Sequence, residues 1–261
     1  NTESVLIGAM LKVIIDETLD DHHFINEKTV NSEDMRKSVV AFDIIKAESI
    51  TGISVDEIRK TARIIAKSKP LSILYGLETI NEQTRADCVK ALINLSMATG
   101  NIGIHGGGLY PLLNGANEQG AKDAGCIPDK LPGYLSLDDE KQISEYEKMA
   151  AYSIPKTPGL SINEMTEAVK SGGLKALHVI GDSPSLVNGE LAKLVNSIDK
   201  LELLIVHASL ENELTAKADI VFPTETFAET EGTYTNLERR VQILNSAIGA
   251  KGYQTPSWTV L

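Results

Sequence analysis

The sequence predicts an α/β fold with parallel β-sheets. Four short, continuous apolar runs are separated by segments with helical periodicity, and a turn of small or polar residues follows each run. Such runs are typical of strands buried on both faces of a parallel sheet, and the helices between them supply the crossover connections. The four runs are residues 71–76, 176–180, 203–206 and 219–223.

The first seventy residues are expected to be mainly helical. Apolar residues between Val5 and Ile15 recur at near-helical spacing, which predicts a helix at the start of the sequence. Ser54 and Glu57 form a capping box that opens a second helix, and the segment 67–70 ends it with two lysines and a proline. The secondary structure of the segment 43–50 is ambiguous.

The middle of the sequence combines one strand, one clear helix and a long glycine-rich stretch. The strand 71–76 is followed by a helix over 84–99, which Gly100 closes at the C-terminal capping position. Residues 103–133 show neither helical nor strand periodicity, so we expect a functional or disordered loop there. A polar surface helix is predicted over 138–152.

From residue 161 onward, helices and strands alternate regularly. Ser161 caps a helix that runs to Val169, and the strands 176–180, 203–206 and 219–223 follow. The helices predicted between these three strands cover residues 190–198 and 210–217. This alternation is the strongest indication of a parallel sheet.

Composition excludes several classes of protein. The protein has 261 residues and a net charge of −11, which argues against nucleic-acid binding, and no apolar run approaches the ~20 residues of a membrane helix. Two cysteines, Cys88 and Cys126, cannot form a disulfide framework or an iron–sulfur site, and we expect free thiols in a cytoplasmic protein. The five histidines show no metal-ligand spacing, so no metal site is predicted.

The two ends suggest that the sequence is a piece of a longer polypeptide. It opens directly on an apolar periodic segment, and Ser257 after Pro256 resembles the start of a helix rather than its end.

The first candidate binding residues lie at strand ends. Ligands of open parallel sheets bind beyond the carboxyl ends of the strands, where glycine lets a ligand approach the backbone. This rule selects Gly76, Gly181, Asp182 and His207. The alternative for each is an ordinary tight turn between strand and helix.

A second candidate is the loop 114–123. Its amides, carboxylate and two glycines suit a planar ligand rich in heteroatoms, such as a pterin or guanine. The alternative is a surface loop that hydrogen-bonds to itself. The candidate residues are Gly115, Asn117, Gln119, Gly120 and Asp123.

The third candidate is the segment 229–242, which carries Thr233, Asn236 and the adjacent Arg239 and Arg240. Neighbouring arginines in an acidic protein can clamp a phosphate or a carboxylate. The alternative is internal pairing with Glu229, Glu231 or Glu238.

These segments, in this order, resemble the molybdopterin oxidoreductases, in particular the formate dehydrogenase alpha subunit and the G subunit of NADH-quinone oxidoreductase. The resemblance extends over essentially the whole sequence, and its most specific part is the run from Gly232 to Gln242. The other matching segments are 98–103 with 106–108, 115–125 with 131–134, 176–184, and 218–223 with 227–229.

The resemblance implies Rossmann-like parallel-sheet domains of the formate dehydrogenase and dimethyl sulfoxide reductase type, with domains 2 and 3 present in part. Residues 1–70 would form the helical part of the first domain, 71–160 an α/β segment with the cofactor loop, and 161–261 the rest of the cofactor-binding core. The implied cofactor is molybdopterin guanine dinucleotide with Mo or W. The iron–sulfur cluster and the metal ligand would lie outside these residues, which are therefore expected to be inactive alone.

Three departures from the formate dehydrogenase pattern keep two functions open. Leu113 stands where an arginine usually precedes the amide-rich loop, Glu78 follows the first strand, and His207-Ala208 replaces a Gln-Asp pair. One interpretation is a catalytic subunit that contributes to the oxidation of formate or a similar small substrate. Another is a scaffold without molybdenum, like the G subunit of NADH-quinone oxidoreductase, and a third is a generic nucleotide-binding module. The partners implied are other redox subunits, through which the protein would also associate with a membrane complex.

Overall fold

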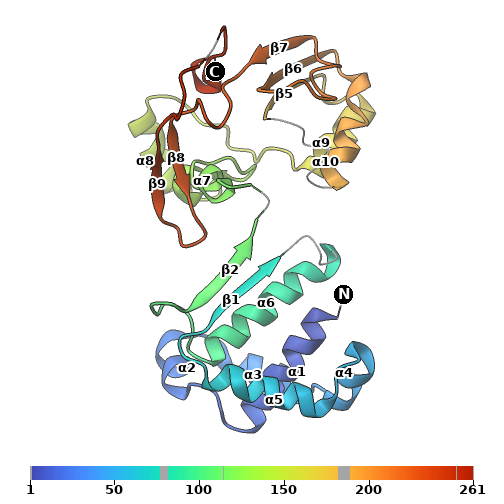
Figure 1. Cartoon of the computed structure of the whole chain (residues 1–261), viewed down its shortest axis with the longest axis vertical. Coiled ribbons are helices and arrows are strands. Elements are labelled where there is room, and N and C mark those ends of the chain that lie inside the picture. Colours follow the sequence, from blue (N-terminus) through green and yellow to red (C-terminus); the bar gives the residue numbers. More distant parts are fainter. Residues whose placement is uncertain (1, 77–81, 114, 182–188, 251, 261) are drawn as a thin grey trace. The chain divides into compact units, whose positions relative to one another are not determined.

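The computed structural model describes residues 2–76, 82–113, 115–181, 189–250 and 252–260. The chain divides into two compact units, residues 1–113 and 114–261 (Figure 1). Each unit combines helices with a parallel β-sheet, which confirms the predicted α/β class. The predicted division of the chain into residues 1–70, 71–160 and 161–261 stays a prediction. No helix in the described part of the chain is long and apolar enough to cross a membrane.

Unit 1 is mainly helical, and the two helices predicted within the first seventy residues are present in it. Its α1 is the central helix, and the buried core contains Ile7, Met10 and Ile14 of this helix together with side chains of α3–α6. Ser54 and Glu57 form the predicted capping box, and Asp43 caps α4, which resolves the ambiguous segment as a helix. The helices are α1 (Glu3–Asp16), α2 (His22–Lys28), α3 (Ser32–Val40), α4 (Ile44–Thr51), α5 (Val55–Lys67) and α6 (Glu82–Ala98).

The sheet of unit 1 has two parallel strands, β1 (Ser72–Gly76) and β2 (Gly108–Leu112). The sequence prediction missed β2, which lies in the stretch expected to be a loop, because Gly108 and Pro111 obscure its pattern. The prediction of β1 as a buried strand is wrong for one face. Ile73 and Tyr75 pack on the core, whereas Leu74 is 61% exposed.

Unit 2 contains a three-stranded parallel sheet in the order β5-β6-β7. These strands are β5 (Ala176–Ile180), β6 (Leu203–Ala208) and β7 (Ile220–Pro223), which closely match the predicted runs. The helices α9 (Ile162–Ser171) and α10 (Gly189–Val195) lie beside this sheet in Figure 1. The other elements are α7 (Glu118–Asp123), β3 (Lys130–Leu131), η1 (Pro132–Tyr134), β4 (Leu135–Ser136), α8 (Glu140–Ala150), η3 (Ile198–Lys200), β8 (Gly232–Thr235), β9 (Val241–Leu244) and η4 (Ser257–Thr259).

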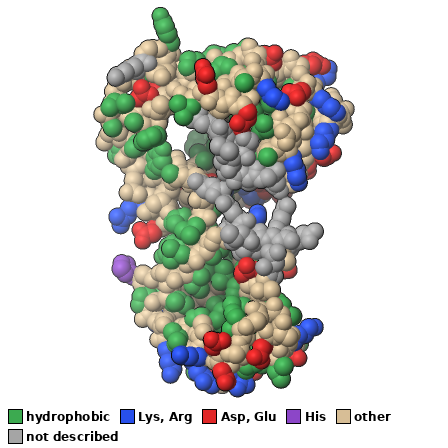
Figure 2. All heavy atoms as spheres, turned by 45° about the vertical axis from the view of Figure 1, so that its right-hand side comes forward, with side chains coloured by type: hydrophobic (Ala, Val, Ile, Leu, Met, Phe, Trp, Pro, Cys, Tyr) green, Lys and Arg blue, Asp and Glu red, His purple; other side chains and the backbone are tan. Residues whose placement is uncertain are grey.

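The two faces of the β5-β6-β7 sheet differ. Leu204, Val206 and Ala208 point into the unit 2 core, where Val195 and Leu214 pack against them. The opposite face carries His207, and Ile180 on this face is 52% exposed, so β5 is not the fully buried strand expected. Apolar side chains are also visible on the surface in Figure 2, among charges of both signs.

Two further predictions for unit 2 need correction. The segment 210–217 is a series of turns rather than a helix, because the Asn212 side chain accepts hydrogen bonds from the backbone N–H groups of Leu214 and Thr215. The loop expected over 103–133 also contains the short helix α7. The antiparallel hairpin β8–β9 has no counterpart in the sequence prediction.

Candidate functional site

Several predicted site residues meet where α7 packs against the β8–β9 hairpin. The connection is the side-chain amide of Asn117. Its Nδ2 donates to the carbonyl oxygen of Thr233 at 3.0 Å, and its Oδ1 accepts from the backbone N–H of Thr235 at 2.8 Å. One amide thus pairs with the outer edge of β8 much as a neighbouring strand would.

Gly120 makes room for this contact. A Cβ at this position would overlap Oδ1 of Asn117, the atom that accepts from Thr235. The glycine predicted as a cofactor contact therefore has a structural role in joining the loop to the hairpin.

Gln119 and Asp123 form the next part of the site. Nε2 of Gln119 donates to Oδ1 of Asp123 at 2.8 Å and to the hydroxyl of Tyr134 at 3.1 Å. Among the described residues, no hydrogen bond uses Oε1 of Gln119 or Oδ2 of Asp123. These two acceptors remain available for N–H donors of a ligand.

The turn of the hairpin is organised by Asn236. Its Oδ1 accepts from the backbone N–H groups of Glu238 and Arg240 at 3.0 and 2.9 Å, and its own N–H donates to the Arg240 carbonyl. Arg239 adopts a left-handed backbone with φ of 61°. Asn236 therefore fixes the backbone from which both arginine side chains project.

Both arginine side chains are exposed, and the Arg239 guanidinium lies over the ring of Tyr134, 5.8 Å from its centroid. Neither arginine forms an ion pair within the described residues, so the predicted alternative of internal pairing is not found there. Glu229 instead accepts from the backbone N–H and hydroxyl of Thr226. Two cations are thus available for an oxyanion.

His207 lies at the carboxyl end of β6 and is fully buried. Its ring is 4.8 Å from that of His178 and 4.9 Å from that of Phe222, and neither ring nitrogen has a hydrogen-bond partner among the residues that the structure describes. Burial, and secondly the charge of nearby His178, lower the pKa of His207. The lowered pKa favours the neutral imidazole, whose hydrogen-bonding capacity is not used by any described residue.

Within unit 2, Gly181 is a predicted residue that forms no hydrogen bond with the α7–hairpin cluster among the described residues. Gly181 follows β5 and donates its N–H to the His207 carbonyl at 3.0 Å. Gly115 is exposed at the start of the loop, and Gly76 ends β1 in unit 1. Asp182, like Glu78, lies outside the described residues. No described group of three or more His, Cys, Asp or Glu side chains could hold a metal ion.

Tyr134 is the residue that the set of sequence candidates missed. It contacts Gln119 and Arg239, and it is one of few non-glycine residues with positive φ. The sequence signal was its place after Pro132-Gly133 in a segment that carries the family resemblance.

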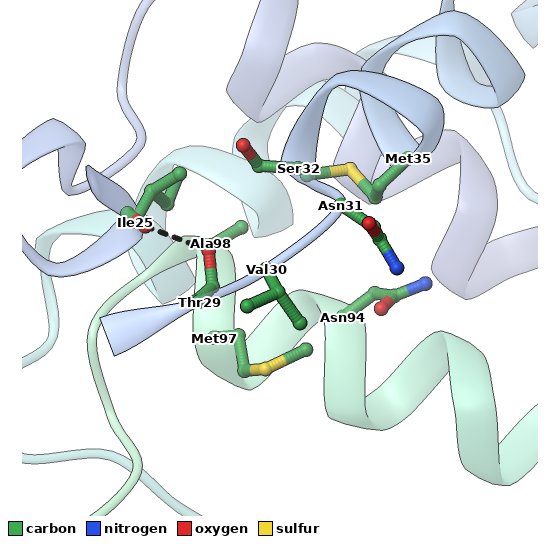
Figure 3. Close-up of a pocket in the computed structure, with 9 residues that line it drawn as sticks. All are labelled: Ile25, Thr29, Val30, Asn31, Ser32, Met35, Asn94, Met97 and Ala98. Atoms are coloured by element: carbon green, nitrogen blue, oxygen red, sulfur yellow. Dashed lines mark hydrogen bonds between the residues drawn. The ribbon is translucent and has the colours of Figure 1, made fainter. Parts of the chain in front are cut away.

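A cavity of about 160 Å³ lies in unit 1, between the end of α6 and the loop from α2 to α3 (Figure 3). Ligand sites are usually about 300–1,000 Å³, so this cavity is too small for a dinucleotide. It also contains none of the predicted site residues. Its lining is Ile25, Thr29, Val30, Asn31, Ser32, Met35, Asn94, Met97 and Ala98.

Comparison with known proteins identifies related sequences. The family model described as molybdopterin oxidoreductase matches residues 5–261. The F420-dependent formate dehydrogenase subunit alpha of Methanocaldococcus jannaschii is 34% identical over 262 residues, which is 100% of this chain and 38% of that relative. Formate dehydrogenase H of Escherichia coli is 32% identical over 257 residues, 98% of this chain and 36% of that relative. The chain thus spans little more than a third of either relative.

A solved structure has the same fold. Acetylene hydratase from Pelobacter acetylenicus superposes with a TM-score of 0.74 at 18% identity, covering 99% of this chain and 38% of that one. At this identity the likeness concerns the fold alone.

Proposed function

Since the chain belongs to the molybdopterin oxidoreductase family, we propose that it supplies part of the binding site for a molybdopterin guanine dinucleotide in a formate dehydrogenase-like enzyme. Bound Mo or W would take up the two electrons released when a small substrate such as formate is oxidised. The metal ligand, the iron–sulfur cluster and the remaining subunits would be supplied by other segments or other polypeptides.

The single observation that carries this proposal is the pair of exposed arginines without carboxylate partners, within the described residues, at the tip of the hairpin. A pyrophosphate-containing ligand is strongly anionic, and this protein has a net charge of −11, so local cations are needed to offset repulsion. Arg239 and Arg240 supply such cations, and guanidinium groups bind phosphate oxygens through paired N–H donors.

The donor and acceptor groups around the arginines also fit the ligand. Oε1 of Gln119 and Oδ2 of Asp123 are acceptors suited to the N–H groups of a pterin or guanine. His207 has two buried nitrogens that no described residue pairs with, at a strand end, where ligands of parallel sheets bind. Gly76, Gly115, Gly181 and Asp182 would complete the backbone contacts of the cofactor.

One observation favours the second function, a scaffold without its own molybdenum like the G subunit of NADH-quinone oxidoreductase. Ala208, in the place of an expected acidic residue, is only 6% exposed and points into the unit 2 core. Alanine at this position offers no carboxylate to the N–H groups of a guanine. The third interpretation, a generic module, is set aside because the family match covers residues 5–261.

Metal and pterin analysis of the full-length protein separates the two functions. Stoichiometric Mo or W together with pterin, and formate-dependent dye reduction, are expected for the catalytic function. Absence of metal together with intact NADH-dependent electron transfer would exclude it and support the scaffold function.

A further inference from the structure

We propose that Tyr134 is a positioning residue, whose ring holds the guanidinium of Arg239 in the orientation in which it takes an oxyanion of a phosphate ester. This inference rests on the proposed function, in which the hairpin tip binds the phosphate groups of the cofactor. It adds a residue that acts through Arg239 rather than by touching the ligand.

The first observation is the backbone of the two residues. Tyr134 has φ of 62° and Arg239 has φ of 61°, and the preceding Gly133 has φ of 77°. Left-handed backbone is unfavourable for residues with a Cβ, and such residues concentrate at sites where a side chain must be aimed. Here two of them, far apart in the sequence, bring their side chains into contact with each other.

The second observation is that the ring itself is held in place. The Tyr134 hydroxyl accepts from Nε2 of Gln119, whose other donated bond goes to Asp123 on the same short helix α7. Gly125 supports the same segment, because a Cβ there would lie 2.8 Å from the Pro132 ring. The hydroxyl of Tyr134 is thereby connected to α7, and the face of its ring is free to contact Arg239.

The third observation concerns what Arg239 does not do. The protein has 36 acidic residues, yet within the described residues Arg239 has no carboxylate partner. Its guanidinium lies over the Tyr134 ring, where the negative face of the aromatic system attracts the cation without using its N–H donors. Those donors remain free for two oxygen atoms of a phosphate.

The test combines NMR of arginine side chains with calorimetry, using inorganic pyrophosphate as the probe. The variants are Tyr134→Phe, which keeps the ring, and Tyr134→Ala and Tyr134→Leu, which remove it. Tyr134→Leu retains most of the apolar volume, so it serves if Tyr134→Ala does not fold. Tyr253→Ala is the matched control, because Tyr253 is 96% exposed.

We expect the Nε–Hε signal of Arg239 to keep its ring-shifted position in Tyr253→Ala and to lose it in the ringless variants. Tyr134→Phe keeps the ring but loses the hydrogen bond from Gln119, so we expect it to retain most of the ring shift. Pyrophosphate affinity should fall about two- to five-fold in the ringless variants, the value of an exposed cation–π contact. A ringless variant with unchanged signal and affinity would overturn the inference, as would a Tyr134→Phe variant that behaves like the ringless ones. A displaced signal with no pyrophosphate binding by any variant would support the positioning and contradict the proposed function of the hairpin tip.

Discussion

Asn117 and Thr235, which belong to distant segments of the sequence, are joined by a hydrogen bond of 2.8 Å from the Thr235 N–H to Oδ1 of Asn117. The same amide donates to Thr233, so one side chain attaches the amide-rich loop to the hairpin that carries the two arginines. The loop and the arginines therefore form one site through a connection that neither segment reveals by itself.

Replacement of Asn117 by alanine should detach α7 from β8. Two hydrogen bonds are lost and the Thr235 N–H is left without its acceptor, so we expect a loss of about 1–3 kcal/mol in the free energy of unfolding. Urea denaturation measures this. Asn196→Ala, which changes an exposed asparagine of the same unit, should stay within about 0.5 kcal/mol of the unmodified protein. An equal loss of unfolding free energy in both variants would show that the Asn117 side chain does not hold α7 against β8.

Gly120→Ala should resemble Asn117→Ala, because the new Cβ would occupy the place of the Asn117 amide oxygen. The double variant Asn117→Ala/Gly120→Ala is expected to be less destabilised than the sum of the single variants, since both act on one contact. Gly115→Ala is the control, as its Cβ would meet only atoms at 3.6 Å or beyond. Strict additivity would show that the two positions act separately.

Stability should depend on pH through Asp21 in unit 1. The hydrogen bond from Lys69 and then that from the Phe24 N–H lower the pKa of Asp21. A carboxylate with a lowered pKa stabilises the fold at pH values above its unfolded pKa, and this contribution is lost as pH falls through the folded pKa. Both side chains are partly exposed, so the effect is within about 1 kcal/mol.

The difference in unfolding free energy between the unmodified protein and Asp21→Asn should therefore be fully present above about pH 5 and shrink as the pH falls below about 4. Asp34→Asn, at an exposed ion pair on α3, is the control. A constant difference over this range would be inconsistent with a lowered pKa of Asp21.

His207 should give a second pH dependence, at higher pH. Burial lowers the pKa of His207, so the unfolded protein binds a proton that the folded protein excludes, and stability falls as pH drops below about 6.5. His207→Leu removes this dependence together with two buried nitrogens that lack a partner in the described part of the chain, and we expect it to be at least as stable as the unmodified protein at neutral pH. Thermal unfolding at about pH 5.5 and about pH 7.5, on either side of the ordinary histidine pKa, tests this. A marked destabilisation at neutral pH would reveal a polar contact of the ring.

The sequence was sufficient for the strands and helices whose signals are local. The apolar runs predicted β1, β5, β6 and β7, and the capping residues predicted the start of α5 and α9. The predictions that were wrong concern segments whose structure depends on contacts between distant residues, or on side chains that form hydrogen bonds with the backbone in place of helical ones. The strand β2 pairs with β1 although glycine and proline interrupt its pattern, and the turns over 210–217 follow from the Asn212 side chain.

The sequence predicted which residues belong to the candidate site, but it did not predict how they are arranged in space. Gln119 and Arg239 were chosen for their chemistry, and the structure brings both into contact with Tyr134, which was not chosen. Asn117, also chosen for its chemistry, joins α7 to β8 instead. No pattern along the sequence could show that Asn117 reaches β8, since this depends on the missing Cβ of Gly120. The binding roles of these residues stay predictions.

Replacement of both Arg239 and Arg240 by alanine tests those roles most directly. If the hairpin tip binds phosphate, the double variant should bind guanosine diphosphate at least about tenfold more weakly, because charge-assisted hydrogen bonds contribute about 1.5–3 kcal/mol each. The unmodified protein should also lose affinity as salt is raised, since exposed charges are screened, and the double variant should show a weaker salt dependence. Lys156→Ala, an exposed cation elsewhere in unit 2, removes a single positive charge and should leave both properties nearly unchanged. Equal binding by the unmodified protein and the double variant would mean that the arginines, although they form no ion pair within the described residues, do not contact the ligand.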